Sequence, residues 1–116
     1  MHEMSIAASI LEAVEIEAGR HPGARVLEVG LRIGEWAGVD PEALRFCFEA
    51  MHAGSGNAAP VLHIEIMPRT DRCLSCGATF PAAAQSCPQC GASQTTPAGG
   101  TELEFAYLEI EEPDAS

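Results

Sequence analysis

The sequence has few basic side chains. Lysine and arginine together number 6 against 17 aspartate and glutamate residues, so the formal net charge is −11. A surface this acidic repels the phosphate backbone of DNA and RNA, which argues against nucleic acid as a partner. Such a charge suits a protein that handles cations or docks on basic protein surfaces, although solubility alone would also explain it.

Long apolar segments are missing as well. No apolar run reaches the ~20 residues that a membrane-spanning helix needs, and no basic stretch followed by an apolar one marks a secretory leader. We therefore expect a cytoplasmic protein that does not enter a membrane. In a reducing compartment the five cysteines are more often metal ligands or free thiols than disulfides.

Familiar catalytic signatures are also absent. The sequence shows no paired nucleophile and base, no phosphate-binding loop and no glycine-rich dinucleotide turn, so we expect no enzymatic activity. His21, His52 and His63 lack ligand spacing relative to one another, and we interpret them as surface or strand residues.

Two helices are predicted from the spacing of apolar residues. The first runs from Met4 to about Gly19, where glycine ends it. The second follows Asp40-Pro41, because aspartate caps a helix and proline fits its first position. Its predicted buried face carries Leu44, Cys47, Phe48 and Met51.

Three strands are predicted from alternating apolar and polar residues, at 25–35, 61–67 and 102–110. In the last strand the apolar positions change parity near Ala106-Tyr107, which predicts a β-bulge there. The Gly- and Pro-containing residues 95–100 are interpreted as a polar linker.

These elements predict an α+β fold. We expect a three-stranded sheet with two helices on one face, and a four-cysteine, zinc-ribbon-like module inserted before the last strand. The predicted domain limits are 1–70 with 99–112 for the α/β domain, 71–98 for the cysteine module, and 113–116 for a tail.

Four of the cysteines form two Cys-x-x-Cys-Gly units, Cys73 to Gly77 and Cys87 to Gly91. A gap of two residues lets both sulfurs of a pair reach one ion, and the glycine allows amide groups to point at sulfur. Two such units give a tetrahedral sulfur site, which suits Zn²⁺ and leaves no open position for catalysis. Because the module has few large apolar residues to make a core, the metal would stabilise it.

Three other readings of the cysteines are weaker. Iron could occupy the same four ligands. A thioredoxin-like redox pair would sit in a strand-to-helix turn, which neither unit does. Paired disulfides would require secretion.

The chain start, Met1-His2-Glu3, offers a second set of ligands. The free amine of Met1, the backbone nitrogen of His2 and its imidazole can form fused chelate rings with nitrogens nearly in a plane. Such donor sets suit Ni(II) or Cu(II), and Glu3 could add a carboxylate or a hydrogen bond. This site requires that Met1 is not removed and that its amine is not modified. We expect Met1 to be retained, because the bulky side chain of His2 should discourage its removal. By itself this pattern is weak, because most chain starts are frayed.

Asp40 and Cys47 each have a simple structural reading. Asp40 is interpreted as a helix cap, with a role beside the chain start as the alternative. Cys47 lies on the predicted buried face of the second helix and is interpreted as a core residue.

The start MHEMS, followed by a helix, stands together with CLSCG and CPQCG ahead of a final strand. With IGEWAGVDPEALRFCFE and GGTELEFAYLEIEE, these stretches make the chain resemble the HypA/HybF family of hydrogenase maturation nickel metallochaperones. The resemblance covers essentially the whole chain, and its specificity comes from the combination of motifs.

The resemblance implies a function and its residues. Ni(II), as transferred cargo, would be held by Met1, His2 and Glu3, with Asp40 as an additional carboxylate, and Cys73, Cys76, Cys87 and Cys90 would hold structural Zn(II). The family delivers nickel to the large subunit of [NiFe]-hydrogenase with a GTPase partner, HypB, and some members also serve urease. The segment between the two cysteine units is somewhat short and rich in alanine, which departs from the family.

Two other function classes stay open. A zinc-ribbon interaction module without a transported ion would keep all of its activity when His2 is replaced by alanine. A small redox enzyme would have thiols that titrate freely and cycle with a reductant, whereas zinc-bound thiolates resist alkylation.

Exchange of the last strand between two chains would give a homodimer.

Overall fold

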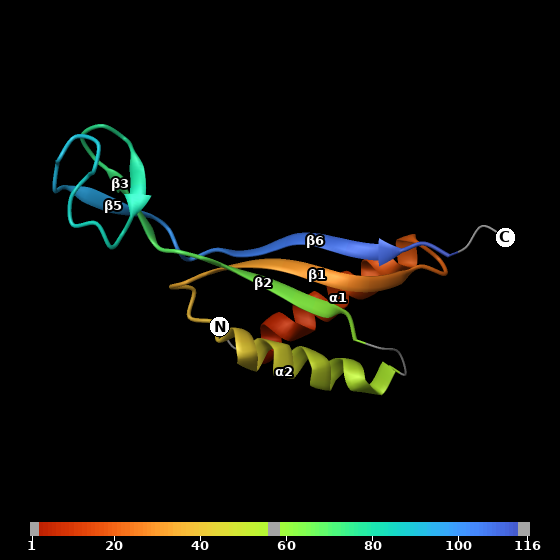
Figure 1. Cartoon of the computed structure of the whole chain (residues 1–116). Helices are drawn as coiled ribbons and strands as arrows, with labels where there is room; N and C mark the ends of the chain where they lie inside the picture. The colour runs from red at the N-terminus through yellow and green to blue at the C-terminus, as the bar shows by residue number, and fades with distance from the viewer. Residues whose placement is uncertain (1–2, 56–58, 114–116) are drawn as a thin grey trace. The chain divides into compact units, whose positions relative to one another are not determined.

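The computed structural model describes residues 3–55 and 59–113. None of the helices in these ranges is long and apolar enough to cross a membrane. Along the chain (Figure 1) the elements are α1 (Glu3–Arg20), β1 (Arg25–Gly34), α2 (Pro41–His52), the short 3-10 helix η1 (Ala53–Ser55), β2 (Val61–Met67), β3 (Thr70–Cys73), β4 (Thr79–Pro81), β5 (Thr95–Gly99) and β6 (Leu103–Glu111).

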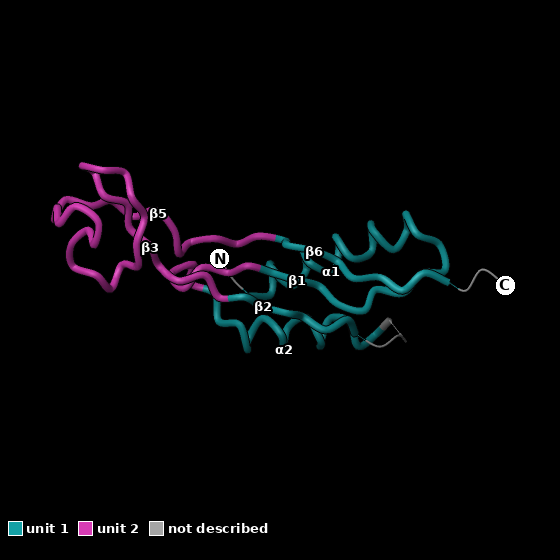
Figure 2. Tube along the Cα trace, turned by 45° about the horizontal axis from the view of Figure 1, so that its top comes forward, with its two compact units in different colours: residues 1–31, 39–65, 105–116 teal, residues 32–38, 66–104 magenta. Residues whose placement is uncertain are grey.

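The chain forms two compact units, shown in Figure 2. Unit 1 contains the described residues of 1–31, 39–65 and 105–116, and unit 2 contains 32–38 and 66–104. The four paired cysteines all belong to unit 2, whereas Cys47 belongs to unit 1. The domain limits expected from the sequence, with 71–98 as the cysteine module, stay a prediction.

Strands β2, β1 and β6 form a sheet in that order. The amide of Gly34 donates to the carbonyl of Glu102 and that of Glu35 to the carbonyl of Met67, both at 2.7 Å. The end of β1 therefore lies beside the start of β6 and the end of β2, so β1 runs antiparallel to β6 and parallel to β2. Helix α2 is the crossover that joins the parallel pair.

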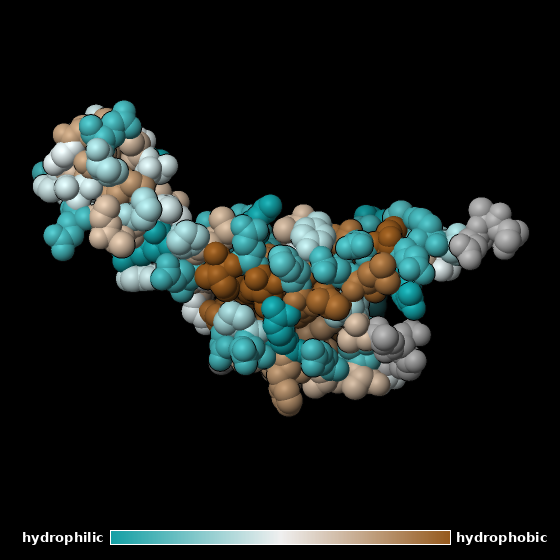
Figure 3. All heavy atoms as spheres, in the orientation of Figure 1, coloured by the Kyte–Doolittle hydropathy of each residue, from teal (hydrophilic) through white to brown (hydrophobic). Residues whose placement is uncertain are grey.

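The core of unit 1 lies between the helices and one face of the sheet, as the predicted α+β fold requires. Val29 and Leu31 of β1 are buried there, and the two helices contribute residues three or four apart, which is how amphipathic elements bury one face. Full burial of a side chain such as Phe48 stabilises the fold by about 1.5–3 kcal/mol. The buried hydrophobic side chains of unit 1 are Ile6, Ala7, Ile10, Val14, Val29, Leu31, Leu44, Phe48 and Leu62. Figure 3 shows a band of apolar side chains over β1 and β2.

Helix α2 begins as the sequence predicts. Asp40 has extended backbone, and its Oδ1 accepts from the amides of Glu42 and Ala43 at 3.0 and 3.4 Å. Pro41 follows at the first helical position, where its missing amide hydrogen costs nothing. The helix-cap reading of Asp40 is confirmed.

Gly30 in β1 lies directly beneath an aromatic side chain. A Cβ added at Gly30 would meet the ring of Tyr107, whose hydroxyl donates to the Glu28 carboxylate on the same strand as Gly30. Glu104 approaches Arg32, which lies on the same face of β1 as Gly30. The β6 residues on this face are therefore even-numbered at Glu104 and odd-numbered at Tyr107, so the alternation shifts by one residue between them. A β-bulge has that effect, and the bulge itself stays a prediction.

We expect Gly30→Ala to destabilise the protein by about 1–3 kcal/mol, because the new methyl group must displace the Tyr107 ring. Urea denaturation followed by far-UV circular dichroism measures this change. Gly19→Ala is the matched control, since nothing lies within 4 Å of its added Cβ and alanine favours helix by about 1 kcal/mol. A Gly30→Ala variant at least as stable as the wild type would contradict the packing of Tyr107 on Gly30.

The second sheet, in unit 2, differs from the sequence-based expectation. Strand β3 pairs antiparallel with β4 and with β5, with Asp71 opposite Phe80 and Cys73 opposite Thr95. The interpretation of residues 95–100 as a linker is therefore wrong for Thr95–Gly99. Their Gly and Pro suggested a linker, but β5 is an edge strand, where a proline is tolerated.

A small apolar cluster also forms within the cysteine-bearing segment. Phe80 packs with the buried Cys73 and Cys87, and three partly buried alanines surround them, namely Ala78, Ala84 and Ala92. The expectation that this segment makes no hydrophobic core is wrong in this respect. Two of the cluster's three buried members are themselves cysteines of the paired units, so this core depends on how the sulfurs are held.

Candidate metal centres

The four paired cysteines converge at one point. The sulfurs of Cys73 and Cys90 lie 3.5 Å apart and those of Cys76 and Cys87 3.6 Å apart, and all four sulfurs lie within 4.8 Å of one another. A tetrahedral zinc with bonds of about 2.3 Å has sulfurs about 3.8 Å apart. The donor set and its spacing therefore fit a tetrahedral metal ion.

The two Cys-x-x-Cys units have the same local structure. The amides of Gly77 and Gly91 donate to the carbonyls of Cys73 and Cys87 at 3.0 and 2.8 Å, and both glycines have φ of 79°. That left-handed backbone favours glycine and turns each unit back on itself. The amides of Cys76 and Cys90 then point at the sulfurs of Cys73 and Cys87, at 3.5 Å each.

The amide contacts make two thiols more acidic than usual. The Cys76 amide is the largest cause that lowers the pKa of the Cys73 thiol from 9.0 to about 6, and the Cys90 amide likewise lowers the pKa of Cys87. The Ala92 amide lowers the pKa of Cys90, but the thiol of Cys73, burial and the other two thiols raise it to about 12. The four sulfurs repel one another as thiolates, so a cation is needed for all four to ionise together near neutral pH.

The predicted nickel ligands at the chain start lie mostly beyond the part of the structure that can be described. Met1 and His2 are outside the described residues, and Glu3 is the first residue of α1 with a half-buried side chain. Helices α1 and α2 contact each other in unit 1, and both begin at the left end of that unit in Figure 1. Asp40, at the start of α2, is exposed and accepts its two capping hydrogen bonds through Oδ1.

One contact within unit 2 was not anticipated from the sequence. The guanidinium of Arg69 lies 3.9 Å from the ring centre of Trp36, and the Arg69 amide donates to a Glu35 carboxylate oxygen at 2.9 Å. Trp36 precedes α2 and Arg69 follows β2, so this cation–π contact joins two segments far apart in sequence. Periodicity could not reveal it, because both residues lie outside the regular elements.

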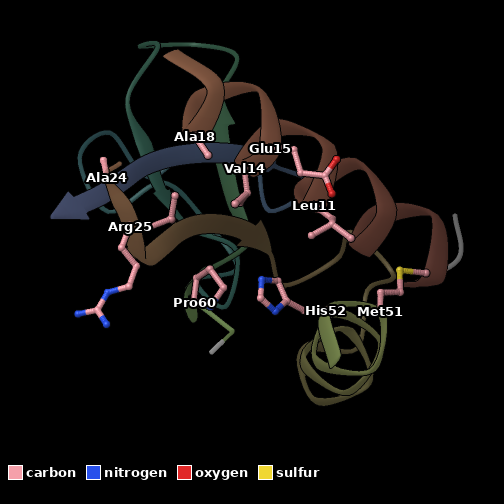
Figure 4. Close-up of a pocket in the computed structure, with 10 residues that line it drawn as sticks. Leu11, Val14, Glu15, Ala18, Ala24, Arg25, Met51, His52 and Pro60 are labelled. Carbon is pink, nitrogen blue, oxygen red and sulfur yellow. The ribbon is translucent and has the colours of Figure 1, made fainter. Parts of the chain in front are cut away.

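The isolated histidines have different environments. Only 9% of His52 is exposed, so its reading as a surface or strand residue is wrong: it lies on the buried face of α2, one turn after Phe48. Figure 4 shows it beside a hollow of unit 1 that is also lined by Leu11 and Val14 of α1. His63 is an exposed residue of β2, as expected, and His21 is half-buried. Cys47 is only half-buried rather than in the core.

Comparison with known proteins gives a consistent result. A family model described as HypA, hydrogenase/urease nickel incorporation, metallochaperone, matches residues 1–110. The chain is 42% identical over 113 residues to the hydrogenase maturation factor HypA of Dechloromonas aromatica, covering 96% of this chain and 100% of the relative. The corresponding protein of Geobacter metallireducens is 43% identical with the same coverage.

Solved structures agree in fold. The chain is similar to the solution structure of the Ni metallochaperone HypA from Helicobacter pylori, with a TM-score of 0.63 and 22% identity, covering 97% of this chain and 100% of the other. A second solution structure, described as HypA protein, gives a TM-score of 0.73 at 22% identity, with 97% and 98% covered. At this identity the likeness supports the fold alone.

Proposed function

Because the chain belongs to the HypA family of hydrogenase and urease nickel-incorporation metallochaperones, we propose that it binds Ni(II) at its N-terminus and helps to insert the ion into the large subunit of [NiFe]-hydrogenase. The family match over residues 1–110 carries this proposal. It spans the chain start and all four paired cysteines, which are the two ligand sets of the sequence.

The proposed nickel ligands are the Met1 amine, the backbone nitrogen and imidazole of His2, and a supporting carboxylate from Glu3. Their chemistry supports this set, because nitrogen-rich tetragonal sites suit Ni(II). Glu3 opens α1, and the other proposed ligands directly precede that helix in the sequence. Incoming ligands from a recipient protein can then replace the nitrogens one at a time.

Asp40 is the fourth proposed nickel residue, and two substitutions separate its two roles. Asp40→Asn keeps an N-cap side chain, whereas Asp40→Ala removes it and is expected to cost about 1 kcal/mol of stability. Both remove the carboxylate, so we expect both to weaken nickel binding about equally. Urea denaturation and nickel titration of the two variants measure these effects. If only the alanine variant bound nickel more weakly, the cap and not a metal contact would be responsible.

For the four paired cysteines we propose structural Zn(II). The tetrahedral sulfur spacing supports a metal of that geometry, and a fully thiolate-ligated zinc has no open position. We therefore assign the zinc a role in holding shape. The protein would have no catalytic activity of its own.

The proposed partners are the hydrogenase large subunit and a nickel-insertion GTPase, HypB, in the cytoplasm. Urease is the second candidate recipient, favoured by the description of the matching family model, which names both enzymes. We also propose a homodimer formed by exchange of β6 between two chains. The alternative function is a zinc-ribbon interaction module that transfers no metal.

Hydrogenase maturation in cells lacking their own family member tests the proposal. The wild-type chain should restore hydrogenase activity, and His2→Ala should restore at least about tenfold less, because loss of a metal ligand removes nickel affinity. His63→Ala, a change at an exposed histidine of β2, should behave as wild type. Full activity of His2→Ala would favour the interaction module instead.

A further inference from the structure

An apolar groove runs between α1 and the edge of the main sheet. It has a volume of 480 Å³ and is lined by Ala13, Ile16, Glu17, Arg20, Phe105, Ala106, Tyr107 and Leu108, all in unit 1. Two of its apolar side chains are unusually exposed, 51% for Ile16 and 44% for Phe105; Tyr107 also lines it, although its ring lies over Gly30 on the other face of the sheet. Apolar side chains gathered in a groove in this way mark a surface that a partner covers.

The groove borders an edge strand. Among the strands that the structure describes, β6 pairs within its sheet only with β1, as Figure 1 shows. Its other side presents backbone amides and carbonyls that another extended chain can pair with. An edge strand beside an apolar groove is the geometry by which peptides add to a sheet, with the backbone supplying hydrogen bonds and pockets taking alternate side chains.

The charges around the groove are acidic. Glu12 lies one turn before Ile16 on α1, Glu109 follows Tyr107 by two residues on β6, and both are exposed. The one basic lining residue, Arg20, pairs with Glu17 at 2.6 Å. Acidic side chains also surround Tyr107. The hydrogen bond to Glu28, burial, and the charges of Glu28 and Glu109 raise the pKa of Tyr107 to about 12.

We propose that the groove between α1 and β6 binds an extended, basic segment of a partner protein, which adds to the sheet as a strand beside β6. Apolar side chains of that segment would contact Ile16 and Phe105, and its lysines or arginines would face Glu12 and Glu109. This surface goes beyond the proposed nickel function and does not depend on it.

Charge also separates this occupant from a second copy of the chain. Strand β6 carries Glu104, Glu109 and Glu111 and no basic residue. Two β6 strands side by side would place like charges near one another, which destabilises a strand pair. A basic segment beside β6 would instead be attracted by these carboxylates.

The test uses the zinc-loaded full chain without nickel and a peptide as long as β6 in which lysine and valine alternate. Amide chemical shifts from NMR should change at 13–20 and 105–108. The same peptide with glutamate in place of lysine, or with alternate amides methylated, should bind at least about tenfold more weakly. Equal binding of the acidic or methylated peptide would overturn the proposal.

Two matched variants locate the surface. Ile16→Lys should weaken binding of the basic peptide by at least about tenfold. Phe46→Lys changes an apolar residue of α2 that is 73% exposed and does not line the groove, so it should bind as wild type. Equal affinity of the two variants would overturn the proposal, as would a wild-type dimer in sedimentation that Ile16→Lys converts to a monomer.

Discussion

Serine in place of Cys73 is expected to release the metal and to unfold residues 71–98. Cys73 is both a member of the four-sulfur cluster and one of the three buried side chains of the small core around Phe80. Phe80 is the only large apolar side chain of that core among the described residues. The core alone therefore cannot supply the stability that the metal contributes. Structural zinc contributes about 10–16 kcal/mol in small zinc-dependent peptides at neutral pH.

Zinc content by mass spectrometry and the NMR signals of the Phe80 ring measure this outcome. The expected result is one zinc per chain in the wild type and none in Cys73→Ser, with collapse of the Phe80 signals. Cys47→Ser is the matched control, because Cys47 lies in α2 outside the cluster and should keep its zinc. Retention of zinc by Cys73→Ser would refute the four-sulfur site, and a coloured protein would indicate iron.

Nickel affinity is expected to fall steeply as the pH decreases from about 8 to 5.5. An α-amino group has an ordinary pKa of about 7.7–8.0 and an imidazole of about 6.5, and each must lose its proton to bind metal. Each of these two groups should therefore add about a tenfold fall in affinity per pH unit below its own pKa, in addition to the fall caused by the proton that the His2 backbone nitrogen releases on binding.

Competition titration with a chelator of known affinity gives this profile. In His2→Ala, the pH dependence that sets in below the imidazole pKa should disappear. The pH dependence that sets in below the pKa of the α-amino group should remain. A nickel affinity that did not change between pH 8 and 5.5 would show that the ion is bound by other groups.

The helices and the three long strands were predictable because their signals are local. Asp40-Pro41 fixes the start of α2 through the cap, and alternation in β1 places Val29 and Leu31 in the core. The four-cysteine cluster was predictable for the same reason, since the two-residue gap and the following glycine determine the geometry of each unit.

The parts that sequence alone did not give depend on neighbours far along the chain. Residues Thr95–Gly99 become a strand only because β3 lies alongside them. His52 is buried because the rest of unit 1 packs around the end of α2, and the contact of Trp36 with Arg69 joins segments outside any periodic element. Local patterns carry no information about such pairings.

A calorimetric nickel titration of three zinc-loaded forms tests the central claim, that cargo is held by the first residues of the chain. The forms are the native start, a start extended by glycine and serine, and His2→Ala. We expect stoichiometric binding by the native start alone, with both altered forms weakened by at least about a hundredfold because each loses a nitrogen of the chelate. Equal nickel uptake by all three forms would contradict the account.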